Sequence, residues 1–193
     1  MEHPNQTDKQ DGRPVCFVTG HRPKRFQFPE SDPRCQKIKD AIAGEIKWLY
    51  DNQGIRGVWV GGAMGVDTWA AEIVLKLQKQ SAYKDIALYV AIPFPEHGAD
   101  FPPKQKERYQ HILKECTDSV VVCRSFRPDA YKRRDYYMVD YSCCGIAVYD
   151  QDRSIRSGTG TTVNYAAKKK DISMVFIPPD TAAISRSIPA VDP

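Results

Sequence analysis

The hydrophobic pattern alternates along the chain between short apolar runs and longer stretches with helical periodicity. Between residues 33 and 52, apolar residues recur every three or four positions, as on one face of a helix, at Ile38, Ile42 and Ile46. The run at residues 86–92 is almost continuously apolar, which is typical of a strand buried on both faces. The pattern predicts strands at about residues 15–19, 57–60, 86–92, 119–123, 145–149 and 172–177, and helices at about 33–52, 65–80, 103–116, 131–141 and 158–170.

Strands that alternate with helices at this spacing predict an α/β fold built from βαβ units. We expect a mostly parallel sheet of about six strands with helices on both faces. A chain of 193 residues is long enough for one well-cored domain, which we expect at residues 15–179. The polar residues 1–14 and the aperiodic, Ala-, Ser- and Pro-rich residues 180–193 are expected to be disordered.

The composition bears on location and on metal binding. No run of 18 apolar residues occurs, and the first residues lack the apolar core of a signal peptide, so we expect a cytoplasmic protein without membrane association. The six cysteines form no CxxC pair and no zinc-type cluster. They are expected to be free thiols, and no metal site is expected.

The positive charge is modest and spread along the chain. The formal net charge is +4, with short clusters at residues 22–25, 132–134 and 168–170. A protein that binds DNA nonspecifically usually gathers its basic residues into one stripe, so a nucleic-acid partner is not expected. The first two clusters adjoin expected ligand loops and favour local recognition of an anion.

The strongest candidate motif follows the second expected strand, in residues 60–67. Gly61 and Gly62 allow a sharp turn and close approach to a ligand, and Gly65 allows the helix to begin close to the strand. Asp67 falls in the first helical turn, where it could cap the helix or reach a ribose hydroxyl. The alternative is a plain tight turn with Asp67 as an ordinary helix residue.

Two further loops and one helical arginine complete the predicted site. Residues 158–162 open a helix with glycines and hydroxyls that can serve a phosphate, or simply cap the helix. Arg22 could bind a phosphate through two hydrogen bonds, with His21 beside it, and Arg134 either joins them or is solvated. Because these loops follow strands of one parallel sheet, we expect them to converge at its carboxyl edge. The predicted ligand-binding residues are Thr19, Gly20, His21, Arg22, Gly61, Gly62, Ala63, Met64, Gly65, Asp67, Arg134, Gly158, Thr159, Gly160, Thr161 and Thr162.

The segments TGHRP, GGAMGVDTWAAE, RDYYMVDYS and SGTGTTVNYAAK occur in this order between about residues 15 and 178. Together they resemble the YpsA/YoqJ-like family of the SLOG superfamily, which also includes the LOG phosphoribohydrolases and the Rossmann-like domain of DprA. The resemblance implies a Rossmann-like three-layer sandwich that binds a nucleotide or nucleotide derivative. It also implies a bacterial or phage origin and, by analogy, a homodimer.

The LOG motifs are matched only in part. Arg134 and Met138 fit the LOG RKxxM motif, although Asp135 replaces its lysine, and residues 158–161 keep the phosphate-holding GxGT. The acidic pair that supports glycosidic cleavage in LOG enzymes is replaced by Val163 and Asn164. Neither residue can stabilise a developing oxocarbenium ion as a carboxylate does. The resemblance therefore favours a nucleotide-binding sensor, sequestering or regulatory protein, with no certain cofactor besides that ligand.

Two other functions remain open from the sequence. One is an enzyme acting at a nucleotide ribose, for which Asp67 is the best catalytic acid. Glu72 lies more than a turn from the glycine loop, and Asp140 points away from the face of Arg134. The other is a DprA-like DNA-associated protein, which the absence of a basic stripe disfavours.

Overall fold

A computed structural model of the chain describes residues 12–151, 157–169 and 171–187. These form a seven-stranded sheet with the order β4-β3-β2-β1-β5-β6-β7, parallel except for β7. The strands are β1 (Val15–Gly20), β2 (Gly57–Val60), β3 (Ala87–Ile92), β4 (Asp118–Val121), β5 (Cys144–Val148), β6 (Ser173–Ile177) and β7 (Ser185–Ser187). The helices are α1 (Pro33–Gln53), α2 (Val66–Leu77), α3 (Pro103–Glu115), α4 (Ala130–Asp140) and α5 (Gly158–Ala166), with short 3-10 turns η1 (Pro23–Arg25) and η2 (Ser81–Tyr83).

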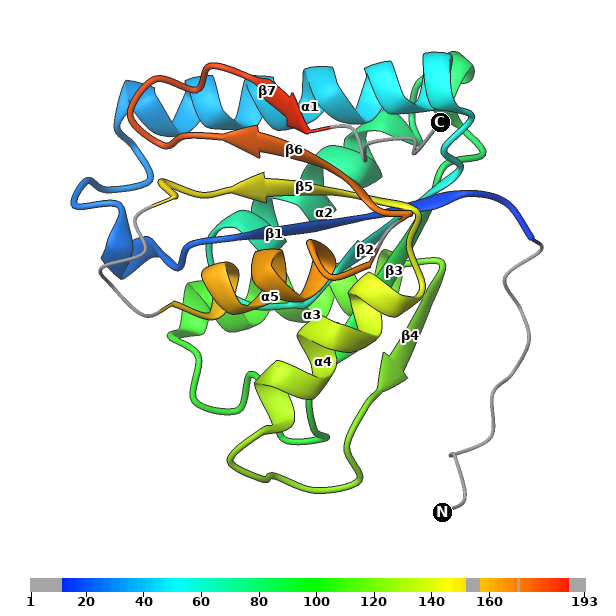
Figure 1. The fold of residues 1–193 in the computed structure, drawn as a ribbon. Helices are drawn as coiled ribbons and strands as arrows, with labels where there is room; N and C mark the ends of the chain where they lie inside the picture. Colours follow the sequence, from blue (N-terminus) through cyan, green and yellow to red (C-terminus); the bar gives the residue numbers. More distant parts are fainter. Residues whose placement is uncertain (1–11, 152–156, 170, 188–193) are drawn as a thin grey trace.

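Helices cover both faces of the sheet, so the predicted three-layer α/β sandwich is confirmed (Figure 1). The apolar face of α1 packs with α2 and α3 against one side of the strands, in a core that includes Ile42, Trp69 and Leu88. On the other side, Met138 of α4 and Ala166 of α5 belong to a second core around Phe17 and Tyr89. β1 and β3 are buried on both faces, which explains their continuous apolar runs.

The strand order places β1 at the centre of the sheet. β2, β3 and β4 extend from one side of β1, whereas β5 and β6 extend from the other. The connections therefore change direction between β1 and β5, and this is the point at which open α/β sheets bind ligands beyond the strands' carboxyl ends.

Local signals set the helix ends. The Asp32 side chain accepts a hydrogen bond of 2.9 Å from the Arg34 N–H and caps α1. Gly54 ends α1 at a φ of 68°, a left-handed conformation that glycine adopts without strain. These are the boundaries that the hydrophobic periodicity and the glycine had indicated.

The segment after residue 180 differs from its predicted disorder. Ser185–Ser187 pairs antiparallel with β6 and covers its outer edge. Arg186 of this strand donates hydrogen bonds of 3.1 and 2.7 Å to the two carboxylate oxygens of Glu45 in α1. This ion pair and the pairing with β6 hold the segment in place. The expectations for residues 1–11 and 188–193 lie outside the described residues.

Two smaller findings bear on the sequence analysis. The six cysteines are all free thiols, as predicted. Among the described residues, no helix combines the length and apolarity that crossing a bilayer requires.

Candidate functional site

The predicted loops after β1 and after β2 are in direct contact at the carboxyl edge of the sheet. Gly65 has a φ of 92°, and a Cβ there would lie 2.9 Å from Cδ of Pro23 and 3.2 Å from the carbonyl oxygen of His21. A Cβ at Gly20 would lie 2.6 Å from the side chain of Val66, at the start of α2. Both glycines are therefore needed for the segment after β1 to pack against the segment after β2.

Arg134 extends from α4 to the same edge and is 5% exposed. Its Nη1 donates a hydrogen bond to the carbonyl oxygen of Gly61 and lies 3.3 Å from Oδ2 of Asp67. Its Nε lies 2.7 Å from Oδ1 of Asp135. A side chain at Gly61 would overlap the guanidinium group, so this glycine makes room for Arg134. We call Asp67, Arg134 and Asp135 the buried charge cluster.

The buried charge cluster holds one cation between two carboxyl groups. Asp67 Oδ2 also accepts a hydrogen bond of 3.1 Å from the N–H of Ala63, which fixes the glycine-rich turn. Burial raises the pKa of both Asp67 and Asp135, and the nearby positive charge of Arg134 opposes that rise. Arg134 is thus already neutralised by the protein, so its role is to join α4 to the glycine loop.

The predicted phosphate loop at residues 158–162 forms the first turn of α5 itself. Ser157 caps the helix by accepting a hydrogen bond of 3.0 Å from the N–H of Gly160. The hydroxyl of Thr161 donates to the carbonyl oxygen of Ser157, and that of Thr162 to the carbonyl oxygen of Gly158. Thr162 also hydrogen-bonds Asp135, which connects α5 to the buried charge cluster. The hydroxyls are therefore engaged within the protein, while Gly158 is exposed.

His21 joins the segments that follow β1 and β5. Its backbone N–H donates to the carbonyl oxygen of Val148 at 3.3 Å, and its Nε2 lies 3.2 Å from Oδ1 of Asp150. Arg25 donates two hydrogen bonds, of 3.1 and 2.8 Å, to Oδ2 of the same carboxylate. Burial lowers the pKa of His21, against the opposing effect of Asp150. These contacts assign His21 a structural role at the reversal point of the sheet.

Arg22 is the predicted cation that faces solvent at this edge. It is exposed, has no ion pair among the described residues, and lies with its guanidinium carbon 5.1 Å from the ring centroid of Tyr131. Gly62 adopts a φ of 68° beneath Tyr109, and Met64 is half-buried beside it. The remaining predicted residues, Thr19 and Thr159, are buried.

Sequence reasoning missed two residues of this edge. Asp135 was treated only as a replacement for a lysine, although its position next to Arg134 could have suggested a partner. His97, in a proline-rich loop, is buried with its Nε2 3.2 Å from the carbonyl oxygen of Gly62. Burial, followed by the charge of Arg134, lowers the pKa of His97 to about 4.

The other acids considered from the sequence lie outside the buried charge cluster. Glu72 accepts two hydrogen bonds of 2.7 Å from Arg108, within an ion-pair network between α2 and α3. Asp140 is exposed and pairs with Lys169 at 2.7 Å. Two surface cavities, of about 470 and 380 Å³, are lined by residues of α1, α2 and α3 and by Glu30, Ser31 and Gln80, not by the predicted ligand residues.

A doubly wound parallel sheet with glycine-rich turns at its carboxyl edge defines a Rossmann-like domain. The YpsA family model (YspA SLOG family) matches residues 16–181. The chain belongs to this family. A UPF0398 protein of Bacillus thuringiensis strain Al Hakam is 30% identical over 159 residues, which are 81% of this chain and 83% of that protein. A UPF0398 protein of Bacillus cereus strain B4264 is 29% identical over the same shares.

Two solved structures share the fold. DNA processing protein A (DprA) from Streptococcus pneumoniae matches with a TM-score of 0.57 and 17% identity, over 86% of this chain and 50% of that chain. DNA processing protein A from Helicobacter pylori, whose structure concerns single-stranded DNA binding, matches with a TM-score of 0.54 and 18% identity. The match covers 86% of this chain and 66% of that chain. At these identities the likeness is one of fold alone.

Proposed function

We propose that this protein binds a nucleotide or nucleotide-derived ligand and acts as a sensor, sequestering or regulatory protein. The observation that carries the proposal is the contact between the segment after β1 and the glycine loop after β2. That contact lies beside the β1–β5 reversal of the sheet. Open α/β sheets bind nucleotides at this position because loops diverge there and helix N-termini point toward the ligand.

In this proposal, Arg22 and the first turn of α5 recognise the anionic part of the ligand. Arg22 is exposed and free of ion pairs among the described residues, so it can pair with a phosphate without breaking an internal contact. The positive end of the α5 dipole lies at Gly158, which is exposed. Arg134 instead supports the glycine loop from below, because its charge is engaged by Asp67 and Asp135.

Binding without turnover is the expected outcome. Val163 and Asn164 lie on α5, and neither carries a carboxylate that could stabilise positive charge on a ribose. The second candidate function is cleavage at the ribose, with Asp67 as the acid. The observation that favours it is the pair of buried carboxyl groups with raised pKa, a combination found in many active sites.

Calorimetric titration with nucleoside mono-, di- and triphosphates, NAD, ADP-ribose and cyclic nucleotides tests the proposal. Arg22→Ala should weaken the affinity for the ligand roughly ten- to a hundredfold, since a hydrogen bond to a charged group contributes about 1.5–3 kcal/mol. Lys37→Ala, which removes an exposed cation from α1, is the control and should leave the affinity unchanged. A panel without any ligand, or equal affinity of Arg22→Ala and the parent, contradicts the proposed site.

Chromatographic detection of free base from AMP separates the two candidates. Ligand binding with no base released supports a binding protein. Base release that Asp67→Asn abolishes, in a variant that still binds AMP, establishes the enzyme instead.

A further inference from the structure

The loop between β4 and α4, together with the first turn of α4, carries most of the excess positive charge of the chain. Residues 124–133 contain four cations and one acid, a formal charge of +3, while the whole chain has +4. Lys132 and Arg133 are exposed, whereas the adjacent Arg134 is buried. The group adjoins the ligand edge, because Phe126 and Tyr131 both pack on Phe94, and Arg22 lies over the ring of Tyr131. We call Arg124, Phe126, Arg127, Lys132 and Arg133 the loop patch.

Phe126 lies in the middle of these cations and is 64% exposed, the most exposed of the large hydrophobic side chains in the described part of the chain. Its ring meets that of Phe94 edge-on, with centroids 5.2 Å apart and an interplanar angle of 87°. The ring is therefore held at the surface by a buried neighbour while most of it faces solvent. An aromatic ring presented in this way is available to stack on another planar group.

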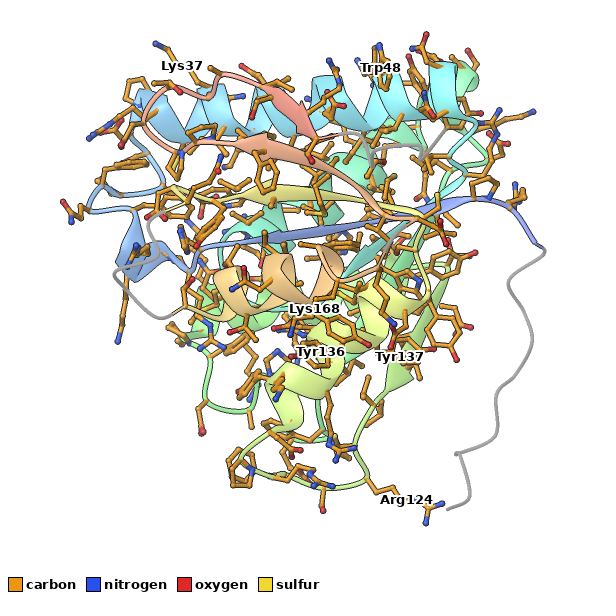
Figure 2. All side chains as sticks on the ribbon, in the orientation of Figure 1. Lys37, Trp48, Arg124, Tyr136, Tyr137 and Lys168 are labelled. Carbon is orange, nitrogen blue, oxygen red and sulfur yellow. The ribbon has the colours of Figure 1, made fainter. Side chains whose placement is uncertain are left out.

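The cations around Phe126 are arranged outward. Asp129, which precedes α4, pairs with Arg127 and lies 2.7 Å from Nε of Arg133. This acid balances one of the two arginines and orients both. Arg124 has no ion pair among the described residues and extends away from the body of the protein (Figure 2). The loop patch thus combines a fixed aromatic ring with uncompensated positive charge.

We propose that the loop patch binds single-stranded nucleic acid, with a base stacked on Phe126 and the flanking phosphates paired with the surrounding cations. Exposed aromatic rings beside arginine and lysine side chains are the elements by which proteins bind single strands, since unpaired bases present free faces for stacking. A duplex buries those faces, and an acidic peptide supplies charge but no ring for Phe126. The residues of the loop patch are not among the predicted nucleotide-binding residues, and the proposal does not depend on the nucleotide site.

The proposal departs from the expectation drawn from the sequence, which disfavoured nucleic acid because no basic stripe was apparent. Binding through a few cations needs only a short patch. Glu96 and Asp100 are exposed in the loop after β3, the strand beside β4, so the positive surface is expected to be short. We therefore infer contact with a few nucleotides.

Fluorescence anisotropy with a labelled twelve-residue oligothymidine at about 50 mM salt tests the proposal. Oligouridine of the same length and a DNA duplex serve as comparison probes. Phe126→Ala should weaken binding to the single strand by on the order of 5- to 150-fold, as expected for the loss of one stacked base. Phe126→Tyr should retain the affinity, and Phe126→Leu should not, because leucine keeps an apolar side chain but lacks a ring.

The salt dependence tests the role of charge. The logarithm of affinity should fall linearly with the logarithm of salt concentration, and Arg124→Ala should reduce the slope by about 0.7, the value for one phosphate contact on a single strand. Lys37→Ala removes the same charge from the exposed surface of α1 and should change neither affinity nor slope (Figure 2).

Several results would overturn the proposal. These are no binding of either single strand, tighter binding of the duplex, equal losses in Lys37→Ala and Arg124→Ala, or unchanged affinity in Phe126→Ala. Binding to vesicles of anionic phospholipid that Phe126→Leu retains, without binding to oligonucleotides, would assign the loop patch to a membrane surface instead.

Discussion

Replacement of Arg134 by alanine should destabilise the fold more than it affects ligand contacts. The side chain is 5% exposed and is the cation between the carboxyl groups of Asp67 and Asp135. Removing one partner of a buried ion pair leaves an uncompensated charge and typically costs about 3–5 kcal/mol. In a chain of this size, 1 kcal/mol corresponds to about 2–4 °C in Tm, so Arg134→Ala should lower the Tm by roughly 6–20 °C.

The loss of stability in Arg134→Ala should increase as the pH rises. Arg134 opposes the burial that raises the pKa of Asp67 and Asp135, so its removal raises both values further. A carboxyl group whose pKa is higher in the folded than in the unfolded state stabilises the fold fully only below its unfolded pKa, which is about 3.9. That stabilisation is lost as pH rises through the folded-state pKa. The Tm difference between Arg134→Ala and the parent should therefore be larger at pH 7 than at pH 4.

Calorimetric or fluorescence-monitored melting from pH 4 to pH 8 measures both effects. Arg133→Ala is the matched control. Arg133 makes only an exposed ion pair with Asp129, so its removal should leave the Tm nearly unchanged. The double variant Arg134→Met/Asp67→Asn should recover part of the loss, since it removes both the cation and one buried charge. A Tm for Arg134→Ala within about 2 °C of the parent at pH 7 would refute the inference that Arg134 stabilises the fold by neutralising the two buried carboxyl groups.

Three other predictions concern separate parts of the fold. Gly65→Ala should destabilise the protein by more than ~1 kcal/mol in urea unfolding, because the φ of Gly65 is 92° and a Cβ there would lie 2.9 Å from a proline ring. Gly44→Ala, in the exposed middle of α1 where a Cβ meets nothing within 4 Å, should instead stabilise it by about 0.5–1 kcal/mol. A stability change of the same sign in both variants would contradict this. Arg186→Ala should lower the urea midpoint by leaving the 1%-exposed Glu45 without its partner, though by less than Arg134→Ala, since water screens the half-exposed arginine. An unchanged midpoint would show that this ion pair adds nothing to stability. With a pKa of about 4, His97 should stay neutral from pH 5 to 8 by NMR titration, and its contribution to stability, present above pH 6.5, should be lost as pH falls toward 4; an imidazole that titrates near 6.5 would contradict its burial.

The six parallel strands and five helices could be predicted because each signal is local. Continuous apolar runs mark β1 and β3, and the spacing of Ile38, Ile42 and Ile46 marks α1. β7 could not be predicted in this way, since its three residues, Ser-Arg-Ser, show no apolar alternation. Its position depends on pairing with the preceding strand β6 and on the ion pair with Glu45, which lies 141 residues from Arg186 in the sequence.

The candidate site was harder to predict than the fold. The sequence indicated which loops share an edge, and the structure brings Gly20, Gly65 and Arg134 to that edge, but ligand binding there stays a prediction. It did not indicate that Arg134 is neutralised, because the orientation of Asp135 depends on how α4 packs beside α5. The burial of Arg134 could have been inferred, since it shares a helical face with Ala130 and Met138, which are both buried.

The central position of β1 has a consequence for how the chain folds during synthesis. β1 is the first of these seven strands to leave the ribosome, yet one of its two edges pairs with β5, where Val18 aligns with Ile146. The half-sheet from β1 to β4 needs only contacts between consecutive strands, whereas closure onto β5 must join segments more than a hundred residues apart. A nascent chain that stops before residue 144 therefore exposes the apolar β1 edge, so the second half of the sheet protects β1.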